Sequence, residues 1–363
     1  MTGIRLFLTL PGMNPRVTLR DIAKVANVHY STVSLALRDH PRVSTEVKKR
    51  IQALAQEMGY VPDPALTALN AYRKTKLPIH YKSTIAWIDT WQDENEGLRD
   101  QPTFNEYFLG ASTRARQQGY ELQEFSMRDN DMSPKRLSKI LLSRGIAGLL
   151  LPPRQTQGDR LDLDYDQFST VCFGYSITPH VFHLVTNHQS HSMSLALEEV
   201  SRLGYKKIGV YLHEYVDNKT DNAYAAGYWR FRQRHPQREH MEPCIVPKGQ
   251  SDEAALANWL KNSKPDVIIS DTDEPTIEML EALGLRIPED IGCAWLSLGE
   301  DEERRSGVDQ NGKLIGHTAI DFLIGMIQRG ERGIPKTPIR MLVEGSWRPG
   351  KTLREKAPLP KDG

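Results

Sequence analysis

Short apolar runs alternate with longer amphipathic segments along most of this chain, from Ser83 onward. A run of four to six apolar residues suits a buried strand, whereas apolar residues three and four apart suit a helix lying on a sheet. Parallel strands need long crossover connections, so regular alternation predicts parallel sheets flanked by helices. The predicted strands are Thr84–Ile88, Gly119–Phe125 (a turn leading into a strand), Gly148–Leu151, Thr170–Phe173, Ile208–Leu212, Ile245–Val246, Val267–Ser270 and Ile291–Leu296. The predicted helices are Phe104–Gln118, Pro134–Arg144, Ser190–Leu203, Asn222–Arg234, Glu253–Asn262 and Glu274–Leu283.

These elements form two successive series, which predicts an α/β body of two lobes. In such folds a ligand binds between the lobes, at the carboxyl ends of the strands. The chain has 363 residues, more than one hydrophobic core usually supports, so further domains are expected. The segment that precedes the body therefore needs its own interpretation.

Three features of the sequence bear on cellular location: its apolar runs, its cysteines and its first fifteen residues. No apolar run reaches the roughly 18 to 20 residues that span a bilayer, so no membrane partner is expected. Three separated cysteines, Cys172, Cys244 and Cys293, suit a reducing cytoplasm and give neither a disulfide framework nor a metal site. The apolar run within residues 1–15 is too short for a signal peptide, so we expect a disordered leader, with translation beginning at Met1 or Met13.

Charge is distributed unevenly along the chain. The segment Arg16–Lys76 holds eleven basic and five acidic residues and so carries +6, whereas the whole chain carries +1. The remainder is therefore acidic. A basic head on an acidic body favours a polyanion-binding module attached to a domain with another role.

The basic segment also has the pattern of three short helices. Thr18, with an acid three residues later at Asp21, is typical of a helix start, and Asn27 tolerates the left-handed backbone that ends a helix sharply. A second helix is expected from about Ser31, with Val33 and Leu37 turned inward, and a third after Ser44. A tight turn between the first two helices indicates a helix-turn-helix, although periodicity alone also permits a generic helical bundle. The apolar positions of the third helix are Val47, Ile51, Leu54, Ala55 and Met58.

The amino-acid sequence of this head favours the helix-turn-helix over the generic helical bundle. The run VTLRDIAKVANVHYSTVSLAL at 17–37 and the run RVSTEVKKRIQALAQEMGYVP at 42–62 closely resemble the head of LacI-family regulators. The resemblance implies that the second helix enters the DNA major groove. It further implies that Tyr30 and Ser31 contact base edges and that Thr32 and Ser34 contact phosphate. Thr18 is also counted among the predicted DNA-binding residues.

One recognition position departs from the family. Leu35 stands where relatives often carry Arg or His. A leucine cannot make the bidentate guanine contact of an arginine, but it can pack against a thymine methyl group. We therefore expect an altered operator sequence rather than lost DNA binding.

The following segment, 62–76, resembles the hinge of the same family. Asp63 and Pro64 suit a helix start, so a short helix over about 64–72 is predicted. By resemblance, Leu69 is the apolar wedge that enters the minor groove. The hinge match is looser than the head, since Thr67 replaces a frequent Arg, and an ordinary linker with a surface leucine is the alternative.

The body resembles the periplasmic-binding-protein-like core of LacI-type regulators. The resemblance lies in Arg202–Gly209, Lys264–Ile269, Gly284–Ile291 and Val308–Asn311. The fold class is thus a small all-α helix-turn-helix head plus a two-lobed α/β effector domain. The predicted domains are a leader 1–15, a DNA-binding head 16–61, a hinge 62–76, a body 83–350 (lobes 83–186 with 308–328, and 187–307 with 329–350) and a tail 351–363.

The predicted effector site departs from the family in its polar groups. Tyr224, Ser297 and Asn187 stand where sugar- and purine-responsive members typically carry Arg, an acid and Asp, so strong charged hydrogen bonds are lost. Aromatic residues near strand ends could instead stack on a sugar ring, although ordinary core packing explains them equally well. The candidate effector residues are Asp89, Trp91, Tyr175, Tyr224, Asp273, Trp295 and Ser297.

The predicted function is a DNA-binding transcriptional repressor controlled by a small-molecule effector, either a sugar or a sugar derivative. It is expected to bind palindromic operator DNA as a homodimer, because the tail lacks an apolar heptad for tetramers. An enzyme is disfavoured by the lack of phosphate-loop, metal-ligand and G-x-S-x-G motifs, so no cofactor is expected. The pair His188 and His191 suits surface histidines better than a metal site. A solute-binding protein with the same body is the alternative.

Overall fold

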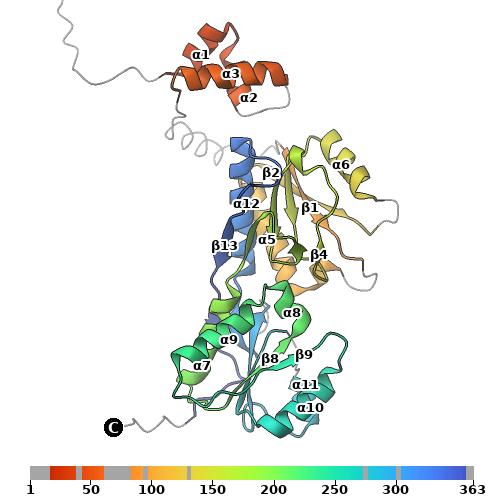
Figure 1. Ribbon diagram of the computed structural model, residues 1–363, viewed down its shortest axis with the longest axis vertical. Coiled ribbons are helices and arrows are strands. Elements are labelled where there is room, and N and C mark those ends of the chain that lie inside the picture. Colours follow the sequence, from red (N-terminus) through yellow and green to blue (C-terminus); the bar gives the residue numbers. More distant parts are fainter. Residues whose placement is uncertain are drawn as a thin grey trace, which may run out of the picture. The chain divides into compact units, whose positions relative to one another are not determined.

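The computed structural model describes residues 17–37, 43–60, 83–92, 97–128, 132–272, 277–299 and 304–356. The chain divides into two compact units, a head within residues 1–78 and a body made of residues 79–327 and 331–363 (Figure 1). The predicted hinge helix, with Leu69, and the candidate effector residue Asp273 lie outside the described residues.

Three helices form the head: α1 (Leu19–Ala26), α2 (Tyr30–Leu37) and α3 (Thr45–Glu57). The start of α1 is a capping box, as predicted. The backbone N–H of Thr18 donates to the Asp21 carboxylate at 2.8 Å, and the backbone N–H of Asp21 donates to the Thr18 hydroxyl at 3.4 Å. The Thr18 hydroxyl also donates to the Asp21 carboxylate at 2.6 Å, and this hydrogen bond, followed by the one from the Thr18 backbone N–H, lowers the pKa of Asp21. At the other end of α1, Asn27 adopts φ of 52°, which turns the chain directly into α2.

The head core is small and consists of residues that share the inner faces of the three helices. Ile22, Val33 and Ile51, one from each helix, are fully buried and belong to a single hydrophobic cluster. In α2 the fully buried partner of Val33 is Ala36, whereas Leu37, predicted to turn inward, is only half-buried. A helix of eight residues buries a narrow stripe, and the small Ala36 permits the close approach of α3. The predicted helix-turn-helix is confirmed.

The first sheet of the body has the strand order β13-β7-β5-β3-β1-β2, and all its described pairings are parallel. The bounds are β1 (Ser83–Asp89), β2 (Tyr120–Ser126), β3 (Gly148–Leu151), β5 (Ser169–Phe173), β7 (His183–Asn187) and β13 (Arg340–Val343). The short strands β4 (Gly158–Asp159) and β6 (Ile177–Thr178) pair separately.

Alternate side chains of β1 enter two different cores, which is why residues 85–88 are a continuous apolar run. Ile85 and Trp87 pack under α5 (Pro102–Gln117) and α12 (Gly312–Arg329). Ala86 and Ile88 pack on the opposite face, against α6 (Pro134–Ser143). A strand covered on both faces reads as a continuous apolar run, and this fixes the sheet between two helical layers.

The second sheet repeats this plan with the order β14-β12-β11-β10-β8-β9. Only β14 runs antiparallel to its neighbour among the pairings described. The strands are β8 (Ile208–His213), β9 (Cys244–Val246), β10 (Val267–Ser270), β11 (Gly292–Leu298), β12 (Ser306–Asp309) and β14 (Ser346–Arg348). One face packs on α7 (Gln189–Arg202) and α9 (Ala223–Arg234), the other on α10 (Asp252–Ser263) and α11 (Ile277–Ala282). A short helix, α8 (Glu214–Lys219), follows β8 directly.

Helices α5 and α12 approach each other at glycines. A Cβ added to Gly110 would lie 2.1 Å from the Lys313 carbonyl oxygen, and one added to Gly316 would lie 2.2 Å from the Tyr107 carbonyl oxygen. Both distances are shorter than any side chain tolerates, so glycine is required on each helix. This contact fixes α12, which directly follows β12 of the second sheet in the chain, onto the first sheet.

The chain passes between the two sheets three times, at β7–α7, β12–α12 and β13–β14. The sequence assigned 329–350 to the second lobe, and this is wrong for β13, which pairs with β7 in the first sheet. Only β14, which pairs with β12, lies in the second sheet. The two strands are separated by two residues, and both are short, so no local periodicity marks the passage from one sheet to the other.

Removing the side chain that fills the centre of the head should unfold the head. We expect Ile51→Ala to destabilise it by about 2–5 kcal/mol, since Ile51 is fully buried in a core of few residues. The exposed Val25, 61% accessible, provides the control: Val25→Ala should change stability by no more than about 0.5 kcal/mol. Denaturant unfolding followed by far-ultraviolet circular dichroism measures both. Equal effects of the two substitutions would contradict the described core.

Candidate nucleic-acid interface and effector site

The start of α2 presents the residues predicted to contact bases. Tyr30 is 50% exposed and Ser31 is exposed, whereas Thr32 and Ser34 are half-buried. Sequence reasoning missed His29, which caps this helix. Its Nδ1 lies 2.8 Å from the Ser31 hydroxyl and 3.4 Å from the Ser31 backbone N–H, which donates to it. The His29 ring also lies 4.6 Å from the Tyr30 ring, so one cap positions both exposed side chains.

Leu35 lies on the predicted recognition helix and also contributes to the head core. It is half-buried and packs against the head core, although the sequence analysis considered it only as a base-reading side chain. Around it, α3 fixes the two other helices: Arg50 donates to the Ala26 carbonyl at 3.3 Å, and Gln52 donates to the Ala36 carbonyl at 3.3 Å. The helix-turn-helix is therefore held by polar contacts as well as by its core.

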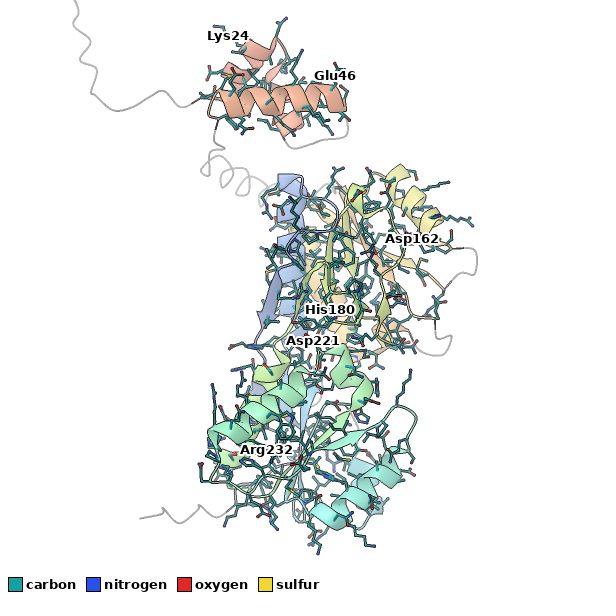
Figure 2. The ribbon with its side chains drawn as sticks, viewed as in Figure 1. Lys24, Glu46, Asp162, His180, Asp221 and Arg232 are labelled. Atoms are coloured by element: carbon teal, nitrogen blue, oxygen red, sulfur yellow. The ribbon has the colours of Figure 1, made fainter. Side chains whose placement is uncertain are left out.

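Several basic side chains are exposed on the described head. Arg20, Lys24, Lys49 and Arg50 are exposed, and Figure 2 labels Lys24 together with Glu46 on the same unit. Cations spread over a small helical unit suit sequence-independent contacts with phosphates.

In the first lobe, the candidate effector residues at the end of β1 are engaged within the protein. Asp89 is 4% exposed, and its carboxylate accepts a hydrogen bond from the Trp91 backbone N–H at 2.9 Å. Burial raises the pKa of Asp89, and this hydrogen bond opposes the rise. The Trp91 indole N–H donates to the Pro153 carbonyl at 2.9 Å, and its ring meets Phe104 edge-on. Packing accounts for the position of Trp91, while effector contact stays a prediction.

In the second lobe, Tyr224 and Trp295 are likewise core residues. Tyr224 is 2% exposed, and its hydroxyl accepts a hydrogen bond from the Gln310 side-chain amide at 3.0 Å. The same amide donates to the Leu296 carbonyl, so it ties α9 to β11. Trp295 is 1% exposed, and the guanidinium of Arg305 lies 4.9 Å from the centre of its ring.

The remaining two candidates lie where the lobes meet. The Ser297 hydroxyl, on β11, is 2.9 Å from the Thr103 hydroxyl, on α5 of the first lobe. Tyr175 is half-buried and meets His180 edge-on at 5.4 Å. Burial raises the pKa of Tyr175, and the nearby charge of Asp221, from the second lobe, adds to this rise. Figure 2 labels His180 and Asp221 in this region.

Two further hydrogen bonds join the lobes beside Tyr175. Lys219 of α8 donates to the Gln155 carbonyl at 3.3 Å, and the Gln157 side chain donates to the Asn218 carbonyl at 3.4 Å. Burial lowers the pKa of Lys219. Together with the Ser297–Thr103 contact, these bonds flank the facing strand ends, where the sequence placed the effector.

A buried charged cluster at the strand ends of the second lobe was missed by sequence reasoning. His213, 4% exposed, places Nδ1 2.8 Å from the Asp271 carboxylate and Nε2 2.8 Å from the Asp252 carboxylate. Burial by itself lowers the pKa of His213, but the hydrogen bonds and negative charges of Asp271 and Asp252 outweigh it, so the pKa is raised. Local sequence does not reveal this cluster, because Asp271 and its histidine partner are 58 residues apart.

Comparison with known proteins agrees with this architecture. Residues 18–63 match the family model of bacterial regulatory proteins of the lacI family. The transcriptional regulator MalR of Streptococcus pneumoniae is 26% identical over 193 residues, 53% of this chain and 56% of the relative, so this match spans little more than half the relative's length. The repressor PurR of Haemophilus influenzae is 22% identical over 338 residues, 87% of this chain and 93% of the relative.

Solved structures show the same fold over nearly the whole chain. The regulator CelR in complex with cellobiose has a TM-score of 0.59 at 19% identity and covers 93% of this chain and 100% of its own. The lac repressor dimer bound to operator and an anti-inducer has a TM-score of 0.55 at 17% identity, covering 94% and 100%.

The fold and the matches define a class of protein, one with a helix-turn-helix head and a periplasmic-binding-protein-like body. The head, residues 18–63, matches the LacI family of bacterial regulatory proteins, and nearly the whole chain is similar to a curated transcriptional repressor, PurR. Of the helices that the structure describes, none is both long and apolar enough to cross a membrane.

The His213 cluster should make stability depend on pH. A folded-state pKa above the ordinary 6.5 means that protonated His213 stabilises the fold fully below pH 6.5, and that this stabilisation is lost as pH rises through the folded pKa. We expect wild type to lose its stability advantage over His213→Gln as the pH rises above 6.5, as measured by urea unfolding.

The control is His317→Gln, on α12, which should keep the wild-type pH dependence. Parallel stability curves for wild type and His213→Gln across this range would show that the two carboxylates do not hold a proton on His213.

Proposed function

We propose that this protein is a sequence-specific DNA-binding transcriptional repressor, active in the cytoplasm as a homodimer and controlled by a small carbohydrate. The observation that carries the proposal is the match of residues 18–63 to the lacI family model, over a head that presents Tyr30 and Ser31 at the start of its second helix. A solute-binding protein, the alternative, has no use for such a head.

In this proposal α2 lies in the major groove. Tyr30 and Ser31 contact base edges, while Thr32, Ser34 and the region around Thr18 contact the phosphate backbone. Thr18 also caps α1, so its hydroxyl supports the N-terminus of a helix whose backbone N–H groups suit phosphate. A homodimer places two such helices on a palindromic site. Residues 62–76 act as the hinge, with Leu69 as the minor-groove wedge.

The effector is proposed to bind between the two lobes. Support comes from the contacts that flank the facing strand ends, Ser297 with Thr103 on one side and Lys219 with Gln155 on the other. Two regulators of the same fold contain sugars, CelR with cellobiose and a LacI-family regulator from Enterococcus faecium with ribose. A ligand that favours one lobe arrangement changes the first-lobe dimer interface, and through it the hinge and DNA affinity.

Selection of random duplex DNA with the purified full-length protein, at a stated salt concentration, tests the DNA-binding proposal. A palindromic consensus is the expected result. No enrichment, with or without carbohydrates present, would overturn it. Titrating the selected duplex with effector then decides whether the ligand releases the protein or recruits it.

Leu35→Arg should change which bases are read. An arginine at this position can make a bidentate contact with guanine, worth about 1–3 kcal/mol against other bases, so the consensus should gain a guanine in each half-site. The control is Val25→Arg, which adds the same charge at an exposed position of α1. It should strengthen binding to all sequences without altering preference. An unchanged consensus for Leu35→Arg, in a folded head, would contradict this role of Leu35.

Tyr175 is the aromatic candidate that is least enclosed by the core, so it provides the test of effector stacking. We expect Tyr175→Ala to weaken binding of the carbohydrate found by a thermal-shift screen about tenfold, while Tyr175→Phe, which keeps the ring, binds nearly as wild type. Isothermal titration calorimetry measures both. If the two variants bind alike, the ring of Tyr175 does not stack on the ligand.

A further inference from the structure

Two histidines and one glutamate meet at the junction of the lobes, apart from the strand-end cluster around His213. His188 Nδ1 lies 4.0 Å from one carboxylate oxygen of Glu344, and His191 Nε2 lies 3.8 Å from the other. The two imidazole rings are nearly parallel, with centroids 5.6 Å apart. All three donor atoms lie within 4.8 Å of one another.

These residues come from two of the three connections between the sheets. His188 and His191 flank the start of α7, directly after β7, and Glu344 lies between β13 and β14. Backbone hydrogen bonds fix the positions: the His188 N–H donates to the Val343 carbonyl at 2.8 Å, and the His191 N–H donates to the His188 carbonyl at 2.9 Å. Asn311, on the third connection, donates to the Glu344 carbonyl at 2.8 Å. The backbone that carries the three side chains is therefore held in place without any ligand.

We propose that His188, His191 and Glu344 bind one divalent transition-metal ion, zinc in the first instance, which bridges the connections between the lobes. Two imidazoles with one carboxylate suit zinc and exclude calcium and magnesium, which prefer oxygen donors throughout. Three protein ligands leave a fourth tetrahedral position for water. The three side chains are accessible from solvent: the exposed fraction is 31% for His188, 37% for His191 and 66% for Glu344.

The present distances suit capture of an ion by a small side-chain movement. With zinc–ligand bonds of about 2.0–2.1 Å, neighbouring donors of a tetrahedral site lie roughly 3.3–3.4 Å apart. From separations of 3.8 Å up to at most 4.8 Å, the donors must therefore approach by about 0.5 to 1.4 Å. Glu344 supplies most of this movement, because it is the most exposed of the three and its carboxylate already faces both rings.

Two features oppose a cation here. The N-terminus of α7 is the positive end of a helix dipole, and the Arg230 guanidinium is near enough to influence His188. The same guanidinium donates to the Ser190 carbonyl at 3.0 Å and to the Ser194 hydroxyl at 2.7 Å. These two hydrogen bonds partly compensate its positive charge. The Glu344 carboxylate provides the local negative charge that offsets both. In the absence of metal, histidine–glutamate ion pairs form here only when the imidazoles are protonated, and because the side chains are exposed such pairs are weak.

A bound ion would stiffen the junction about which the lobes reorient. Because the ion binds only where β7–α7 and β13–β14 lie together, it stabilises the folded body by mass action and restrains movement between the lobes. This role is independent of DNA recognition, so the metal proposal and the repressor proposal stand or fall separately.

The experiment uses full-length protein, freed of any affinity tag and stripped with chelator, titrated with zinc chloride. Wild type is expected to bind one zinc per chain and to gain thermal stability. His191→Gln and Glu344→Gln should each bind zinc at least about tenfold more weakly, since even indirect ligand supports are worth 10- to 100-fold. Glu344→Gln keeps both imidazoles of the β7–α7 connection. Loss of the zinc-induced thermal shift in this variant would therefore show that the ion must also bind the β13–β14 connection. X-ray absorption of the zinc-loaded protein should show imidazole ligands.

The matched control is His317→Gln, which removes a histidine outside the cluster and should bind zinc as wild type does. Circular dichroism establishes that each variant is folded. Equal zinc affinity in wild type, His191→Gln and Glu344→Gln would overturn the proposal. So would binding that saturates only at millimolar zinc, or that weakens equally in His317→Gln, because either result describes unspecific binding to surface histidines.

Discussion

The architecture of the body depends on hydrogen bonds that join its three lobe connections to one another. The Asn187 side chain donates to the Val343 carbonyl at 3.2 Å and accepts a hydrogen bond from the Ser192 hydroxyl at 2.8 Å, which links the first connection to the third. Asn311 donates to the Glu344 carbonyl and to the Ser346 hydroxyl, which links the second to the third. Each sheet is a rigid layer between helices, so movement between lobes must be absorbed in these few residues. Asn187, noted in the sequence for lacking the usual charge of relatives, keeps this linking role through its amide.

The two lobes differ in how the polar side chains at their strand ends are held by hydrogen bonds. In the first lobe Asp89 makes a local hydrogen bond with the chain that follows it. In the second lobe His213 lies between two carboxylates from distant segments, so its ring is held from both nitrogens. A buried charge cluster of this kind is costly to disturb and therefore rigid. The second lobe thus offers a fixed surface, so under the proposed function adjustment to a ligand would fall to the half-buried side chains of the first lobe, such as Tyr175.

The sequence predicted the fold well where structure is local. Strands such as Gly148–Leu151 and Val267–Ser270 agree with the observed bounds, and the Thr18 cap and the Asn27 turn have the predicted geometry. It failed where the chain changes sheets. The short strand β13 joins the first sheet through pairing with β7, more than 150 residues earlier, and a single sequence carries no trace of that pairing.

The candidate sites show the same division. Tyr30 and Ser31 could be placed because a contiguous motif specifies the head. In the body, Trp91 follows β1 as expected, whereas Trp295 lies in the middle of β11 and Tyr224 lies in α9. An aromatic side chain satisfies packing as readily as ligand binding, and the structure shows the packing for all three. His213 was missed for the opposite reason. Its importance lies entirely in partners 39 and 58 residues away, which only the folded chain brings within hydrogen-bonding distance.

The hydroxyl pair of Thr103 and Ser297 sets a scale for the switch between lobe arrangements. A single neutral hydrogen bond contributes about 1 kcal/mol net, which corresponds to a population ratio of roughly five to one at room temperature. Taken alone, this bond biases the body toward one arrangement without committing it, and the bonds of Lys219 and Gln157 across the lobes add to the bias. A ligand of micromolar affinity contributes about 8 kcal/mol of binding free energy, so even a modest preference for one arrangement would exceed the contribution of the Thr103–Ser297 bond. The resting protein would then sample both arrangements, and the ligand would redistribute states that already exist.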